Sequence, residues 1–403
     1  MENTASGSAA RLRIAVVGCG TAGPTAAVLL ARQGHEAVVF ERAPECRAVG
    51  AGFLLQPPGM AVLRELGIEK QVLAHAAKVD RLHVVNPDGS RLLDLRYREI
   101  GSGQFGAGLH RPVLLHYLMQ AMESAAVKVR WGWEITSASR EGGKWSLTSE
   151  KGGTAGDFDL LIIADGARSR LRDLVGAGGR NRGYPWGAHW FIGENRNVFP
   201  ESELYQVVHG TRRLGGFLAT GRTFDNPEPL VSLFWSIRIA DDAGIRSRPI
   251  SEWKREILDL CPRAAVLLDQ IADWSQVMTA RYGDVSLSRW HGEGVAVLGD
   301  AAHAMSPQLG QGVNLGLADA SCLADCISRE RLSVALREYQ RRRWLTIRYY
   351  QLATRWLTPF FQSDHEWLVP VRAGLFGIAG VLPPARMLMT RSMAGMIFGR
   401  GEE

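Results

Sequence analysis

Three glycines near the N-terminus, Gly18, Gly20 and Gly23, have the spacing G-x-G-x-x-G and are the first residues with the pattern of a chemical site. They follow the β-branched apolar run Arg13–Val17 and precede a run of helix-forming residues. Glycines allow a tight turn and a close approach of backbone to a pyrophosphate, whose charge is stabilised by the helix N-terminus. Glu41 lies 18 residues beyond Gly23, at the end of a second apolar run, where a carboxylate can accept from ribose hydroxyls. The pattern predicts a dinucleotide-binding site.

Two further acidic residues follow buried apolar runs: Asp165, with Gly166 beside it, and Asp300. The carboxyl ends of parallel strands meet at one edge of a sheet, and ligands bind at that edge. The segment 301–314 is broken by Gly and Pro and leads into a helix, so we expect a loop shaped around the same ligand. His303 in this segment is expected to be structural, because no partner for a catalytic triad or a metal site accompanies it.

Composition limits the classes of function. The 403 residues carry 47 Lys+Arg against 41 Asp+Glu, a net charge of +6, without the basic patch that binds nucleic acid. The five cysteines are scattered with no C-x-x-C pair, which argues against a disulfide framework or a metal site and favours a reducing cytoplasm. No apolar run reaches the length of a transmembrane helix, and residues 1–12 are expected to form a disordered tail.

These motifs require a parallel α/β framework, and segments of another kind interrupt it. Two apolar runs within 81–98 flank the turn sequence at 86–90 and predict a hairpin. Residues 186–239 contain four further runs rich in aromatic residues, which predict strands of one antiparallel sheet. One face of that sheet could wall an apolar, aromatic-shaped pocket. Residues 250–271 are expected to form one helix with Ser251 as its N-cap.

Three separated motifs resemble those of the class A flavoprotein monooxygenases, the p-hydroxybenzoate hydroxylase-like family. They are the glycine turn with Glu41, the segment 165–172 (D-G-x-x-S-x-x-R), and the segment 299–314 (G-D-A-A-H, then P-x-x-G-Q-G-x-N). The motifs are complete, their order fits, and the match extends from residue 13 to about 340. The resemblance implies an α/β fold in which a Rossmann-like FAD-binding domain carries an inserted antiparallel β-sheet substrate domain and C-terminal helices.

The same resemblance implies a division of the chain. The FAD-binding domain would comprise 13–75, 104–182 and 281–340, the substrate domain 76–103 and 183–280, and the C-terminal helices 341–403. The layout of the C-terminal helices also looks like that of ubiquinone-biosynthesis hydroxylases. Two interpretations of these helices stay open: they cap the FAD-binding domain and close the site, or they associate weakly with a membrane surface.

The resemblance further implies roles for individual residues. FAD would be held by residues of the glycine turn, of the strand ends and of the loop before the last helix of its domain: Gly18, Gly20, Ala22, Gly23, Glu41, Arg42, Gly52, Arg111, Ile135, Asp165, Gly166, Asp300, Gly310, Gly312, Val313 and Asn314. Asp165 and Gly166 would also meet transiently bound NAD(P)H. The residues predicted to line the substrate pocket are Gln56, Tyr205, Phe217, Trp235 and Pro307, with Pro307 beside the reactive face of the flavin.

The implied activity is that of an FAD-dependent monooxygenase. NAD(P)H reduces the flavin, O₂ adds to form a C4a-hydroperoxide, and a phenolic, aromatic or heteroaromatic small molecule is hydroxylated. Epoxidation or Baeyer–Villiger insertion would use the same chemistry. The alternatives are a flavin-dependent reductase or halogenase on the same scaffold, although the halogenase signature W-x-W-x-I-P is absent, or a flavin-binding interaction protein with little turnover. The sequence predicts neither the substrate nor the oligomeric state.

Overall fold

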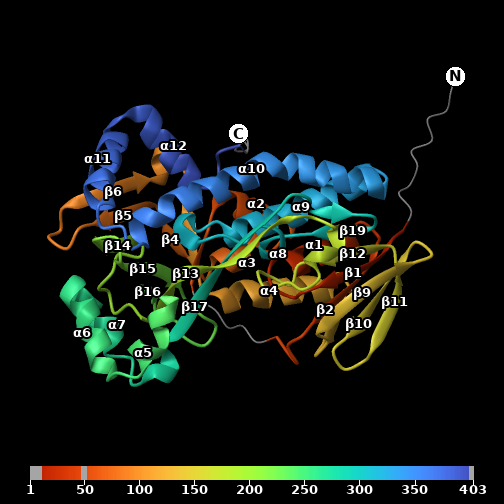
Figure 1. Cartoon of the computed structure of the whole chain (residues 1–403), viewed down its shortest axis with the longest axis horizontal. Coiled ribbons are helices and arrows are strands. Elements are labelled where there is room, and N and C mark those ends of the chain that lie inside the picture. The colour runs from red at the N-terminus through yellow and green to blue at the C-terminus, as the bar shows by residue number, and fades with distance from the viewer. Residues whose placement is uncertain (1–10, 47–51, 399–403) are drawn as a thin grey trace.

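The computed structural model describes residues 11–46 and 52–398. The tail predicted at 1–12 lies outside these residues except for its last two. A six-stranded sheet runs through the part that carries the motifs, in the order β18-β19-β12-β1-β2-β8 (Figure 1). Its strands are β1 (Arg13–Val17), β2 (Glu36–Glu41), β8 (Lys128–Trp131), β12 (Leu160–Ile163), β18 (His291–Gly292) and β19 (Val295–Val297). All neighbouring pairs are parallel except β18 and β19.

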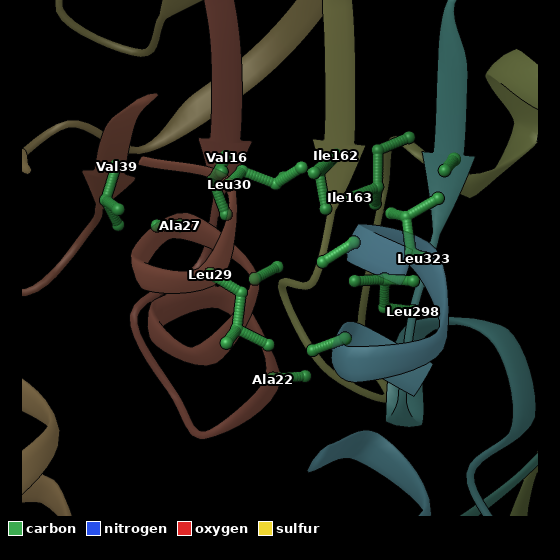
Figure 2. Packing of buried hydrophobic residues seen from close by; sticks show 14 of the residues in the cluster. Val16, Ala22, Ala27, Leu29, Leu30, Val39, Ile162, Ile163, Leu298 and Leu323 are labelled. Carbon is green, nitrogen blue, oxygen red and sulfur yellow. The ribbon is translucent and has the colours of Figure 1, made fainter. Parts of the chain in front are cut away.

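Helices α1 (Ala22–Arg32) and α9 (Gly312–Arg329) cover one face of this sheet. Figure 2 shows Val16 of β1 and Ile162 of β12 on the side of the sheet that α1 and α9 occupy. Protein covers the sheet on both faces, and β1 and β12 are therefore continuous apolar runs. As expected from the sequence, α1 is followed by Gly34 in the left-handed region, at φ +91°.

Two small antiparallel sheets flank the motif-bearing part. One consists of β9 (Ile135–Glu141), β10 (Lys144–Ser149) and β11 (Thr154–Phe158). The other consists of β3 (Phe53–Leu55), β4 (Ala77–Val79) and β7 (Gly106–Leu109). Between these strands run α2 (Pro57–Glu65), α3 (Glu69–Leu73) and α4 (Arg111–Ser124).

A seven-stranded sheet forms the second large layer, in the order β17-β13-β16-β15-β14-β5-β6. Its strands are β5 (Arg81–Val85), β6 (Arg91–Arg96), β13 (Gly179–Glu194), β14 (Glu203–His209), β15 (Arg213–Gly221), β16 (Leu230–Arg238) and β17 (Met278–Leu287). The hairpin predicted around 86–90 is confirmed as β5–β6. The four strands predicted within 186–239 pair with one another in antiparallel fashion, as expected. The hairpin joins them through a parallel pair, β14 with β5, which was not expected. The long strands β13 and β17 run across the boundaries predicted at 183 and 280.

The outer face of the seven-stranded sheet is covered by α5 (Asp242–Arg246), α6 (Ile250–Leu260) and α7 (Ala265–Leu268). The single helix predicted over 250–271 is wrong. Pro262 cannot donate a helical hydrogen bond and its ring clashes with the preceding turn, so α6 ends at Leu260. Pro249 occupies the N-cap position of α6, and Ser251 lies inside the helix.

The C-terminal part consists of α10 (Leu332–Phe361), α11 (Leu368–Val381) and α12 (Pro383–Met393). α10 lies along α9, and α11 with α12 forms an arch over β5 and β6 (Figure 1). Among the helices that the structure describes, none is by itself long and apolar enough to cross a membrane. The pair α11–α12 meets that criterion jointly, but it is bent by 102°.

Candidate active site

The predicted motifs converge on the carboxyl edge of the parallel strands. Gly18 follows β1, Glu41 ends β2, Asp165 lies two residues after β12, and Asp300 begins the short helix α8 (Asp300–His303) after β19. These four strands are neighbours in the sheet, so the residues after them lie along one edge. The structure therefore brings together three motifs that are far apart in the sequence.

The three glycines of the first turn have different surroundings. Gly18 has φ +105°, and a Cβ built on it would lie 2.4 Å from the Ala164 carbonyl oxygen. A Cβ on Gly23 would lie 2.0 Å from the Gly18 carbonyl oxygen. At Gly20, by contrast, a Cβ would meet no described atom within 4 Å. Gly18 and Gly23 are thus required by the fold, whereas the open space at Gly20 suits a ligand that approaches the backbone.

Glu41 lies directly beside this turn. Its carboxylate accepts hydrogen bonds from the backbone N–H of Cys19 at 2.8 Å and of Ala43 at 2.9 Å. The backbone of Trp133 donates to the Glu41 carbonyl at 2.8 Å, which brings the start of β9 with Ile135 close to the same turn. Arg42 is exposed.

Arg111 and Asp300 face the same space from different elements. Arg111 begins α4, and its Nε is buried without a hydrogen-bond partner in the described part of the chain. Burial lowers the pKa of Arg111, and the nearby Asp300 carboxylate opposes that shift. Asp300 itself is exposed. An arginine at the start of a helix is unfavourable by itself, so an anion placed between α4 and α8 would stabilise this arrangement.

Asp165 is a second buried group without a full set of partners. Its Oδ1 makes no hydrogen bond within the described residues, and burial raises its pKa. Gly166 beside it has φ +84° and open space where a Cβ would be. An unsatisfied buried carboxylate oxygen is costly unless a ligand donates to it, so Asp165 and Arg111 both fit a polar cofactor that lies along this edge.

The loop that follows α8 leads into the first turn of α9. It contains the 3₁₀ turn η6 (Pro307–Leu309), and Pro307 is exposed. Gly310 adopts φ +63°, while Gly312 and Val313 form the N-terminus of α9. The backbone N–H groups of this turn have no helical partners and can stabilise negative charge. Pro307 and Gly312 are thus on one continuous segment, which ends in these free N–H groups.

Asn314 ties this turn to β3. Its Oδ1 accepts from the backbone N–H of Gln56 at 2.8 Å, and its Nδ2 donates to the Leu54 carbonyl at 3.1 Å. The Gln56 Oε1 accepts from the buried Tyr97 hydroxyl at 2.6 Å, and the Gln56 Nε2 is buried with no partner among the residues that the structure describes. Tyr97 was not predicted from the sequence, because only the fold places it against Gln56.

His303 is structural, as expected. Its Nε2 lies 2.5 Å from Asp319 Oδ2, which also accepts from the backbone N–H of Gly299 at 3.0 Å. The other oxygen of Asp319 accepts from Arg343 Nε at 2.8 Å. This buried network fixes α8 and α10 to α9. The approach of the elements is close: Cβ atoms built on Gly299 and Gly316 would each lie 3.5 Å from the Ala22 Cβ.

The seven-stranded sheet turns one of its faces toward this site. Along β16, Ser232, Phe234 and Ser236 lie on that inner face, and Trp190 of β13 pairs with Phe234. Phe234 packs with Leu54 and Leu218, and Gly52 lies so close that a Cβ there would meet Ser232 and Thr220. The inner face therefore lies over β3.

Three of the predicted pocket residues do not join this group. Tyr205, Phe217 and Trp235 are buried on the outer face, in the core formed with α6 and α7. Phe217 stacks on Phe199 with ring centroids 4.4 Å apart, and Arg263 lies over the Tyr205 ring. Of the residues predicted for the pocket, Gln56 and Pro307 lie near the N-terminus of α9, whereas the inner face of the sheet carries Trp190 and Phe234 in place of the three buried residues.

Fold and site together define a dinucleotide-binding α/β protein with a second sheet placed over the site. A family model described as an FAD binding domain matches residues 11–346. The chain therefore belongs to the FAD-binding-domain family of flavoproteins.

Several of the proteins similar to this chain are named monooxygenases. It is 32% identical over 337 residues to a probable 2-heptyl-3-hydroxy-4(1H)-quinolone synthase of Rhodococcus erythropolis, covering 81% of this chain and 82% of that protein. It is 28% identical over 335 residues to a kynurenine 3-monooxygenase of Stenotrophomonas maltophilia, covering 77% and 70%. The structure of Klebsiella pneumoniae HpxO with FAD and uric acid superposes with a TM-score of 0.80 at 20% identity, covering 97% and 99%. This chain is an FAD-dependent monooxygenase.

Proposed function

We propose that this enzyme uses NAD(P)H and O₂ to hydroxylate a phenolic or other activated aromatic or heteroaromatic compound. The reaction would take place between the 306–314 loop and the inner face of the seven-stranded sheet. One observation carries the proposal: Gln362 joins these two walls. It accepts from Gln308 Nε2 at 2.9 Å and donates to Ser236 Oγ at 3.2 Å. In this proposal, Pro307 and the ring of Phe234 border the same space.

The residues of this space suit a flat, weakly polar substrate. Trp190 and Phe234 are half-buried and offer aromatic surface. The polar groups nearby are uncharged: Ser232 Oγ and Gln56 Nε2 are buried without partners in the described chain and can bind substrate oxygen or nitrogen atoms. The predicted role of Pro307 beside the flavin is part of this proposal.

Bound FAD supplies the redox chemistry: two electrons from NAD(P)H reduce O₂, one oxygen atom enters the substrate and the other leaves as water. The chain's own residues hold the reactants. The N-terminus of α9 at Gly312 would stabilise negative charge on the reduced ring, and Arg111 would bind the cofactor's anionic part. The apolar wall at Trp190 and Phe234 would exclude water. A cytoplasmic location remains a prediction.

A substrate panel tests the proposal. The purified holoenzyme is mixed with NADH or NADPH and with phenols, prenylated phenols, alkyl-4-quinolones or kynurenine, because relatives are named for compounds of the last two kinds. We expect one class to accelerate NAD(P)H oxidation and to give a product one oxygen atom heavier. Equally slow oxidation with every compound would contradict the proposal and favour the flavin-binding interaction protein.

A further inference from the structure

Helix α11 presents an apolar face to solvent over its whole length. Trp367, Val371, Ile378 and Val381 are 68%, 47%, 63% and 79% exposed, at the spacing that places residues on one side of a helix. The opposite side, with Leu368 and Phe376, is buried. The exposed apolar surface continues at Leu382 in the bend and at Met387 and Leu388 on α12. These seven exposed residues are called the α11–α12 apolar face below.

The apolar face carries no exposed polar side chain. Within 367–390, all of which the structure describes, the polar side chains are those of Arg372, Arg386 and Thr390. Arg372 is 2% exposed and donates to two backbone carbonyls at 2.7 Å. Arg386 forms an ion pair with Glu99 at 2.5 Å, and Thr390 is fully buried. Both arginines are thus used to hold the arch against the protein, and the outside is left apolar.

Cations border this face. Arg391 follows it on α12 and is exposed, and Arg98 is exposed in the 3₁₀ turn η1 (Tyr97–Glu99) that α12 contacts. The Arg91 side chain is 71% exposed on β6, which contacts α11. Two acidic residues precede the helix: Asp364 pairs with Arg212 and Arg238, and Glu366, next to Trp367, is exposed and accepts from Thr211 at 3.4 Å. The arginines therefore outnumber the unpaired acids around the face. An apolar strip with exposed arginines beside it is complementary to a surface whose interior is apolar and whose outer groups are anionic.

We propose that the α11–α12 apolar face docks on the surface of an anionic lipid bilayer. Lipid chains need no hydrogen-bonding groups and this face offers none within its own residues, while the exposed arginines beside it suit anionic head groups. A 14-residue helix is about 21 Å long, too short to span the hydrocarbon core but suited to lie in the interface with its apolar side down. The inner side of the arch packs on β6 of the seven-stranded sheet rather than on the six-stranded sheet, and the proposal concerns its outer side.

Vesicle flotation tests this proposal with the full-length holoenzyme. The probes are vesicles of phosphatidylcholine alone and of phosphatidylcholine mixed with phosphatidylglycerol. We expect the enzyme to float with the mixed vesicles, and the double variant Ile378→Glu/Val381→Glu to lose at least about tenfold in binding. Arg98→Gln/Arg391→Gln should weaken binding only to the anionic vesicles.

The matched pair of single variants is Ile378→Glu and Met278→Glu, which each add one negative charge, the second at a 40% exposed apolar residue on β17. Ile378→Glu should weaken flotation, and Met278→Glu should float like the wild type. Flavin content and melting temperature verify that each variant is folded. Failure of the wild type to float, or equal flotation of the Ile378→Glu/Val381→Glu variant, would overturn the proposal. So would sedimentation of the wild type as a dimer without lipid and of this variant as a monomer, because the face would then be an interface between two copies. None of these outcomes depends on the proposed reaction.

Discussion

At the residue scale, the glycines of the first turn separate what the fold needs from what the cofactor needs. Gly23 packs so tightly that any side chain would meet the Gly18 carbonyl, whereas Gly20 borders open space. Gly23, which the fold requires, and Gly20, which we predict the ligand requires, are three residues apart, and substitution can distinguish the two roles.

We predict that Gly20→Ala leaves the melting temperature of the apoprotein unchanged and raises the Kd for FAD about tenfold, because the methyl group enters the space for the pyrophosphate. Gly23→Ala should instead lower the free energy of unfolding of the apoprotein by about 3 kcal/mol. Thermal unfolding and titration of apoprotein with FAD measure the two quantities. Unchanged FAD affinity in Gly20→Ala would show that no ligand approaches there.

The aromatic residues of the seven-stranded sheet give a second pair for comparison. Phe234→Ala should raise KM for the aromatic substrate with a small change in stability, because its half-buried ring faces the site. Phe217→Ala should cost about 3–5 kcal/mol of stability, because its ring is 1% exposed in the outer core, and should leave KM unchanged in the folded enzyme. Steady-state kinetics measure KM, and denaturant unfolding measures stability. A raised KM in Phe217→Ala together with an unchanged KM in Phe234→Ala would show that the outer-face residues line the pocket.

At the scale of elements, Asp319 of α9 connects α8 with α10. Burial opposes its ionisation, but His303 and Arg343 together hold its pKa below the ordinary value. Because the folded state lowers this pKa, the ionised carboxylate stabilises the fold above an ordinary pKa of about 4, and that contribution is lost as the pH falls further.

Accordingly, Asp319→Asn should lower the free energy of unfolding at neutral pH by about 3–5 kcal/mol, because Arg343 and His303 lose a buried partner. The difference between wild type and variant should shrink as the pH falls below about 4. Chemical denaturation across this pH range measures it. A difference that is small at neutral pH, or that grows on acidification, would contradict the role given to Asp319.

Much of the element order was predictable because its signals are local. The glycine turn, the apolar strands with acids at their ends, and the β5–β6 turn each need only a short stretch of sequence. Alternation along β16 also shows that Phe234 and Trp235 point to opposite faces. A short stretch of sequence does not show which face of the sheet the helices cover. The sequence therefore predicts Trp235 in the pocket, although α6 covers its face of the sheet. Tyr97 was missed for the same reason, since its partner Gln56 lies 41 residues away.

At the scale of the whole molecule, the two large sheets and the C-terminal helices meet around one space. The six-stranded sheet supplies the cofactor edge, the inner face of the seven-stranded sheet supplies the aromatic wall, and α10 continues to Gln362, which joins that wall to the 306–314 loop. α12 reaches the same loop, because Gln311 donates to the Met393 carbonyl at 2.7 Å. In the proposed function, chemistry in this space is thus bordered by both large sheets and by residues at the ends of α10 and α12.

The measurement that tests the monooxygenase account most directly is isotope incorporation under ¹⁸O₂. The holoenzyme is supplied with NADH or NADPH and with the compound that most accelerates its oxidation, and the product is analysed by mass spectrometry. The account predicts one ¹⁸O atom per product molecule and one NAD(P)H consumed for each. Product oxygen derived from water, or NAD(P)H oxidation that yields only hydrogen peroxide with every compound, would contradict it.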